Sequence, residues 1–142
     1  MTILAAVDGE QNPDRVVTIG EDLADAFDDQ LVVVNVLNQN EFEERDDVHQ
    51  AGYTVEDGQN DAESVARSVV KATTDRPGHV QTRGLVGEVV DELLDETERL
   101  DASYLVIGGR KRTAVGKALF GSTTQSVLLS ADVPVVAVMD ET

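Results

Sequence analysis

The stretch from residue 103 to residue 139, "SYLVIGGRKRTAVGKALFGSTTQSVLLSADVPVVAVM", contains two apolar segments separated by a glycine-rich basic loop and a short helical pattern. Three further segments rich in Val, Leu and Ile precede it. The five predicted strands cover residues 2–7, 31–36, 79–86, 103–108 and 134–139. Three of them are nearly continuous apolar runs, which is typical of strands that are covered on both faces, as in parallel sheets.

Helical patterns lie between the predicted strands. The predicted helices cover residues 12–27, 61–74, 87–100 and 122–131. We expect Asn12 to be the N-cap of the first helix, with Pro13 at its first helical position. Asp61 is the candidate N-cap of the second helix, which carries an apolar stripe. The alternation of strands and helices predicts an α/β fold: a single doubly wound domain with a mostly parallel sheet and helices on both faces.

Residues 38–60 are the exception to this alternation, because the segment is long, acidic and without periodicity. We expect a surface excursion here that is partly mobile. Its acidic run is interpreted as a solvated face and not as a metal site. The two histidines, His49 and His79, stand apart in the sequence and form no ligand cluster.

The composition indicates one acidic domain over residues 1–142, with 28 acidic and 11 basic residues and a net charge of −17. Such a surface would repel duplex DNA and anionic membranes, so we expect neither as a partner. Abundant Asp and Glu with only 3 Lys favours adaptation to high salt, the alternative being an ordinary acidic protein. The absence of cysteine excludes disulfides and thiolate chemistry. With no signal peptide and no apolar run of about 20 residues, we expect a cytoplasmic protein.

Candidate binding residues stand at the ends of the predicted strands, where open α/β sheets bind their ligands. Asp8 ends the first strand, Val36 lies near the end of the second, and Gly108 ends the fourth. The Asp8 carboxylate has two interpretations of equal weight. It caps a turn or helix, or it accepts hydrogen bonds from ribose hydroxyls or a base amino group.

The loop after the fourth strand predicts a phosphate site. Four of the eleven basic residues fall within eight positions here: Arg110, Lys111, Arg112 and Lys117. Gly121, Ser122 and Thr123 open the next helix, and the free N–H groups of a helix N-terminus bind anions. Arg and Lys side chains add charge-assisted contacts. The alternative is a flexible loop followed by an ordinary N-cap.

Three familiar motifs are absent. A P-loop needs Gly where this chain has Lys111, and Ser or Thr where it has Ala118. No Gly-x-Gly-x-x-Gly fingerprint follows the first strand, and no Gly-x-Ser-x-Gly elbow occurs. Because the sequence also offers no general base, nucleophile or metal cluster, we predict no catalytic residues and no efficient catalysis.

On these residues the chain resembles the universal stress protein (UspA) family over almost its whole length. Nucleotide-binding members of that family carry Gly-x2-Gly-x9-Gly-(Ser/Thr) after the fourth strand. Gly108 matches the first glycine, and Gly121 with Ser122 matches the final pair, with residues 112–120 between them. The opening "AAVDGE" and the ending "SVLLSADVPVVAV" are also similar to the family's first and last elements.

The resemblance implies a Rossmann-like domain with a five-stranded parallel sheet of order 3-2-1-4-5. It implies that ATP or a related adenine nucleotide, with or without Mg²⁺, lies across the first and fourth strand ends. Asp8 would hold the ribose, and Val7, Val36 and Ile107 would line the adenine. The ribose and phosphates would contact Gly108, Gly121, Ser122 and Thr123. It also implies a regulatory, stress-response homodimer that pairs through the last strand, residues 134–138.

Lys111 departs from the family pattern, because it stands where the motif has its second glycine. Its side chain could obstruct the phosphates, or it could reach round and neutralise them together with Arg110, Arg112 and Lys117. The first outcome leads to a stress protein that binds no nucleotide and acts through protein partners. An enzyme of the adenine-nucleotide α-hydrolase type ranks below both, because "DGEQNPD" at residues 8–14 lacks the phosphate loop that such enzymes carry after the first strand.

Overall fold

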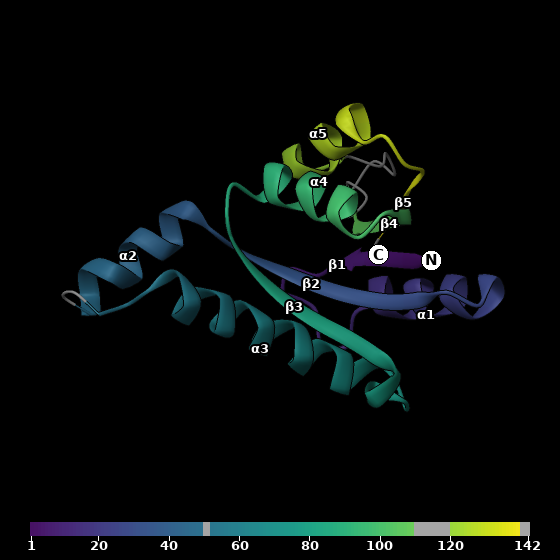
Figure 1. The fold of residues 1–142 in the computed structure, drawn as a ribbon, viewed down its shortest axis with the longest axis horizontal. Helices are drawn as coiled ribbons and strands as arrows, with labels where there is room; N and C mark the ends of the chain where they lie inside the picture. The colour runs from purple at the N-terminus through teal and green to yellow at the C-terminus, as the bar shows by residue number, and fades with distance from the viewer. Residues whose placement is uncertain (50–51, 110–119, 140–142) are drawn as a thin grey trace, which may run out of the picture.

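The computed structural model describes residues 1–49, 52–109 and 120–139. It contains a five-stranded sheet of order β3-β2-β1-β4-β5 in which all neighbours run parallel (Figure 1), so the predicted fold is confirmed. The strands are β1 (Thr2–Ala6), β2 (Gln30–Asn38), β3 (Val80–Gly87), β4 (Ala102–Gly108) and β5 (Val135–Val138). The helices are α1 (Arg15–Phe27), α2 (Gln39–His49), α3 (Val55–Thr73), the 3₁₀ turn η1 (Pro77–His79), α4 (Val89–Arg99) and α5 (Ser122–Ser130).

Strand β1 lies at the centre of the sheet and determines where a ligand can bind. The chain first adds β2 and β3 on one side of β1, and then adds β4 and β5 on the other. The strand order therefore reverses between β1 and β4. In open α/β sheets the carboxyl ends of the two strands at such a reversal flank the ligand crevice.

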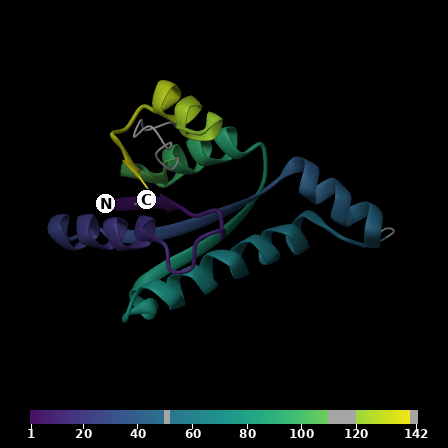
Figure 2. The same ribbon diagram turned by 180° about the vertical axis from the view of Figure 1, so that it is seen from behind.

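Two helical layers cover the sheet. Helices α1 and α3 lie on one face and α4 and α5 on the other (Figures 1 and 2). Side chains alternate between the faces along each strand, so that Ile3 and Ala5 join the core beneath α1 and α3 while Leu4 joins the core beneath α4 and α5. Because both faces are covered, the central strands are apolar at consecutive positions.

Helix α1 begins later than its sequence predicts. Asp14 is the N-cap, and its carboxylate Oδ1 accepts a hydrogen bond from the Val16 N–H at 2.9 Å. The prediction of Asn12 as N-cap and Pro13 as first helical residue is therefore wrong. Asp14 is better placed because it is also tied to α3, where its own N–H donates to the Thr73 hydroxyl at 3.0 Å.

The predicted irregular segment at 38–60 is instead largely helical. Helix α2 occupies Gln39–His49, and α3 begins at Val55, six residues before Asp61. The N-cap of α3 is Thr54, which forms a reciprocal capping box with Asp57, so the proposed capping role of Asp61 is wrong. The first turns of α3 are polar, which is why an apolar stripe locates only its later part.

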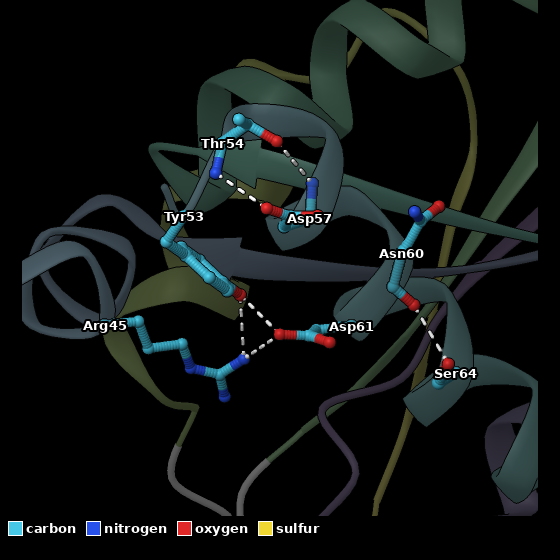
Figure 3. A network of polar contacts seen from close by, with 7 residues as sticks. All are labelled: Arg45, Tyr53, Thr54, Asp57, Asn60, Asp61 and Ser64. Atoms are coloured by element: carbon cyan, nitrogen blue, oxygen red, sulfur yellow. Dashed lines mark hydrogen bonds and ion pairs between the residues drawn. The ribbon is translucent and has the colours of Figure 1, made fainter. Parts of the chain in front are cut away.

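A polar network joins α2 to α3, although α2 extends away from the body of the sheet (Figures 1 and 3). The Arg45 Nη1 donates to the Asp61 carboxylate at 3.0 Å and to the Tyr53 hydroxyl at 3.3 Å, and the Tyr53 hydroxyl donates to the same carboxylate. The Phe42 ring lies 5.6 Å from the Tyr53 ring. These tertiary contacts hold a helix that has no apolar stripe of its own.

Candidate functional site

The carboxyl ends of β2, β1 and β4 bring three of the predicted site residues to one edge of the sheet. Ala6, the last residue of β1, lies opposite Val34 in β2, and Asp8 and Val36 each follow this pair by two residues in the chain. On the other side of β1 the register likewise puts Val7 level with Gly108 of β4. Asp8, Val36 and Gly108 therefore surround the point at which the strand order reverses.

Asp8 is exposed at the start of a tight turn after β1. Its carboxylate Oδ1 accepts a hydrogen bond from the Glu10 N–H at 2.9 Å, which orients the side chain. Gly9 has a φ of 82°, a conformation that side chains disfavour, and a Cβ there would lie 2.6 Å from the Val65 Cγ1 of α3. Glycine at this position therefore lets the turn lie against α3 and keeps Asp8 at the strand end.

The three apolar residues predicted to line an adenine lie on different faces. Val36 and Ile107 belong to the core beneath α4 and α5, whereas the buried Val7 belongs to the core beneath α1 and α3. The Val7 backbone is also fully engaged, because its N–H donates to the Val34 carbonyl at 2.9 Å and its carbonyl accepts from the Asn35 Nδ2 at 2.8 Å.

The buried Asn35 is a supporting residue that the sequence reasoning missed. It lies within the apolar run of β2, where it replaces a hydrophobic side chain with an amide that fixes the end of β1. A single polar residue inside a β-branched run is the signal that could have found it.

The peptide that joins Gly108 to Gly109 is held from two sides. The Gly108 carbonyl accepts a hydrogen bond from the Thr124 Oγ1 of α5 at 2.7 Å, and the Gly109 N–H donates to the Val138 carbonyl of β5 at 2.8 Å. A Cβ on Gly109 would collide with the Met139 sulfur. The end of β4 is therefore held between α5 and β5.

Helix α5 begins at Ser122, shortly after the basic loop in the sequence. Gly121 is the N-cap and offers no side-chain hydrogen bond, and Ser122 and Thr123 are exposed in the first turn. The first-turn N–H groups and the positive end of the helix dipole suit a phosphate. The predicted phosphate-binding cations Arg110 and Lys111 lie outside the described residues, and so do Arg112 and Lys117.

A cation that the sequence reasoning did not select lies at the same edge of the sheet. Arg15, the first residue of α1, donates from Nη1 to the Met139 carbonyl just after β5 at 2.8 Å. Its guanidinium therefore links the start of α1 to the end of the last strand. Within the described ranges, no group of three or more Asp, Glu or His side chains is arranged to hold a metal ion.

A buried carboxylate with a shifted pKa lies away from these strand ends. Burial alone would raise the pKa of Glu96, but hydrogen bonds and charge from Arg99 and Arg83 outweigh it, so the Glu96 pKa is lowered. This ion group connects α4 to β3 and has a structural role. Along the described chain, no helix combines the length and the apolar character that crossing a bilayer requires.

Comparison with known proteins gives a consistent family assignment. The sequence model of the universal stress protein family matches residues 1–139. A curated universal stress protein of Mycolicibacterium smegmatis is 40% identical over 72 residues. That match covers 45% of this chain and 55% of the relative, so the chain spans about half the length of the curated relative it matches.

Two solved structures cover nearly the whole chain. A universal stress protein from Archaeoglobus fulgidus superposes with a TM-score of 0.70 at 28% identity, covering 96% of this chain and 97% of that one. The structure of the universal stress protein from Archaeoglobus fulgidus in complex with dAMP has a TM-score of 0.65 at 24% identity, covering 96% of both chains. At 24% identity, the comparison with the dAMP complex shows a shared fold only.

Proposed function

Because the chain belongs to the universal stress protein family, we propose that it binds an adenine nucleotide, with ATP as the preferred ligand, between the carboxyl ends of β1 and β4. One observation carries the proposal. Among the described residues, no side chain caps the N-terminus of α5, and Thr124 attaches this helix to Gly108, where the strand order reverses. The dAMP complex of the Archaeoglobus fulgidus protein supports an adenine nucleotide as the class of ligand.

The proposed contacts divide the nucleotide among the strand ends and α5. Asp8 accepts hydrogen bonds from the ribose hydroxyls, and Val36 and Ile107 contact the adenine from one face of the sheet. The phosphates, alone or with Mg²⁺, lie at the first turn of α5 beside Arg110 and Lys111. The protein then acts as a cytoplasmic regulator whose nucleotide state is read by partner proteins, and not as an efficient enzyme.

Replacing Gly121 with valine is expected to weaken ATP binding at least tenfold, about 1.4 kcal/mol, because a branched side chain at the N-cap obstructs the first-turn donors. The protein is purified in molar KCl, since its net charge of −17 favours a protein adapted to high salt. Bound small molecules are identified by mass spectrometry, and ATP affinity is measured by calorimetry. Gly78→Val is the control, because no atom lies within 4 Å of a Cβ at Gly78.

The alternative function is a stress protein that binds no nucleotide and acts through protein contacts. Lys111 favours it, because it replaces the second glycine of the family motif. The same measurements distinguish the two functions. If the purified protein carries no nucleotide and does not bind ATP at millimolar concentration, nucleotide binding is wrong and the alternative function is supported.

We also propose a homodimer that pairs through residues 134–138. Strand β5 is an edge of the sheet and consists of Val and Ala, and α5 before it exposes 81% of Leu129. Apolar edges of this kind are either paired or prone to aggregation. Sedimentation equilibrium in molar KCl is expected to give twice the chain mass of 15.3 kDa. A monomer mass across the micromolar range contradicts this proposal.

A further inference from the structure

We propose that Thr124 is a positioning residue that sets the distance between the phosphate-binding N-terminus of α5 and the end of β4. The proposal rests on the proposed nucleotide-binding function. It adds a residue that contacts no ligand and acts on the phosphates through the helix that would bind them.

The geometry around Thr124 is that of a fixed attachment. Thr124 is the third residue of α5, it is 7% exposed, and its Oγ1 donates to the Gly108 carbonyl at 2.7 Å. That carbonyl belongs to the peptide whose N–H, from Gly109, donates to β5. The end of β4, the start of α5 and the end of β5 are thus connected through one peptide group.

The three hydroxyls at the start of α5 have different surroundings. Ser122 and Thr123 are exposed, where a ligand can reach them, while Thr124 is buried and bonded to the protein. The N-cap is glycine, so no side chain at that position fixes the first turn. Among the described residues, the Thr124 hydroxyl makes the side-chain hydrogen bond that orients this turn relative to β4.

The distance matters because hydrogen bonds to phosphate tolerate little error. An N–H···O bond spans about 2.7–3.2 Å, so a displacement of about 1 Å takes a donor out of range. The helix dipole also acts only within the first turn. The proposed adenine contacts of Val36 and Ile107 and the proposed ribose contact of Asp8 come from the ends of β1, β2 and β4, and they do not depend on where α5 lies. Loss of the Thr124 hydroxyl should therefore affect the phosphates and leave the nucleoside contacts intact.

The test compares Thr124→Val with the wild-type protein for two probes, ATP and adenosine, by calorimetry in the same buffer. We expect the variant to bind ATP about tenfold more weakly and adenosine within about twofold of wild type, because a helix N-terminus binds anions and adenosine carries no phosphate. Thr124→Ser keeps the hydroxyl and should restore ATP affinity. Amide hydrogen exchange without ligand should be faster in the first turn of α5 of the valine variant.

Thr97→Val is the matched control. Thr97 is also a buried helical threonine beneath the same face of the sheet, and its Oγ1 donates to the Leu93 carbonyl at 2.7 Å. This control should leave the ratio of ATP to adenosine affinity unchanged. Circular dichroism verifies that each variant is folded.

The outcomes separate this role from the proposed function. If wild-type protein binds ATP more tightly than adenosine and Thr124→Val keeps the same ratio, the positioning role is wrong while nucleotide binding stands. Equal weakening of both probes, or failure of Thr124→Ser to restore ATP affinity, also overturns it. If wild-type protein binds neither probe, the proposed function is wrong, and this role for Thr124 falls with it.

Discussion

Replacing Gly84 with alanine is expected to lower the free energy of unfolding by about 3 kcal/mol, at the upper end for overpacked sites. Helix α3 crosses β3 directly above Gly84, and a Cβ there would collide with the Gln59 carbonyl oxygen and the Glu63 nitrogen. Both atoms belong to the helix backbone, so no side-chain rotation relieves the contact. The helix must move away from the edge of the sheet.

Urea denaturation in fixed molar KCl measures this effect, with Gly78→Ala as the control. Gly78 is exposed, and a Cβ there has no atom within 4 Å. The control should stay within about 0.5 kcal/mol of wild type, as surface substitutions usually do. Equal stability of the two variants would mean that α3 does not lie against Gly84 in solution.

Replacing Arg83 and Arg99 together with methionine is expected to cost about 3 kcal/mol at pH 7, because it leaves the buried Glu96 carboxylate without its cations. Glu96 is 3% exposed and cannot recover its hydration where it lies. In the wild type its lowered pKa gives stability that is present above the unfolded value of about 4.3 and is lost as the pH falls through the folded value.

The double variant should show the opposite dependence on pH. Without the guanidinium groups, burial raises the pKa of Glu96 in the folded protein. The contribution of Glu96 to stability is then greatest in acid and is lost as the pH rises through this folded pKa. The stability difference from wild type should therefore shrink between pH 7 and pH 4. Arg67→Met with Arg76→Met changes the net charge equally, but the carboxylates that lose their cations, Glu63 and Asp25, are 23% and 61% exposed, whereas Glu96 is 3% exposed. This control should cost about 1 kcal/mol or less, and the cost should change little with pH. A parallel pH profile for both double variants would contradict the role assigned to Glu96.

The sheet could be predicted because its signal is local. Each buried strand is a short run of β-branched residues, and the predicted strands agree with β1 to β5 to within two residues at each end. The order of the strands is a different matter, since periodicity alone does not fix which strands are neighbours. The strand order is predicted from the resemblance to the universal stress protein family, which rests on Gly108, Gly121 and Ser122.

The helical region around residues 39–60 could not be read from its pattern. Helix α2 has no apolar stripe, and what holds it is the contact of Phe42 and Arg45 with groups that follow it in the chain. The start of α3 depends on the capping box of Thr54, which precedes a polar stretch. The predicted N-cap of α1, Asn12, lies two residues before the observed one, Asp14. The hydrogen bond that favours Asp14 joins it to Thr73, which is 59 residues away in the sequence.

The candidate site was predictable in position and not in its supporting contacts. Glycine and hydroxyl residues after a strand pointed to the α5 N-terminus, and the structure begins that helix at Ser122. Nothing local distinguishes Thr124 from Thr123, because the difference lies in the distant carbonyl that only Thr124 reaches. The side of the sheet that Val7 faces likewise follows from strand pairing and not from composition.

The central place of β1 has a consequence for how the chain is made. Thr2 lies opposite Gln30 on one side and Ala102 on the other. At a ribosomal speed of about 5–20 residues per second, the second edge of β1 stays without its neighbour for about 5–20 s while residues 2 to 102 are translated. A nascent chain carrying β1, β2 and β3 thus exposes, at what becomes the middle of the sheet, a strand edge that other chains can join. We therefore expect that the nascent chain needs protection from aggregation at the free edge of β1 until β4 has been translated.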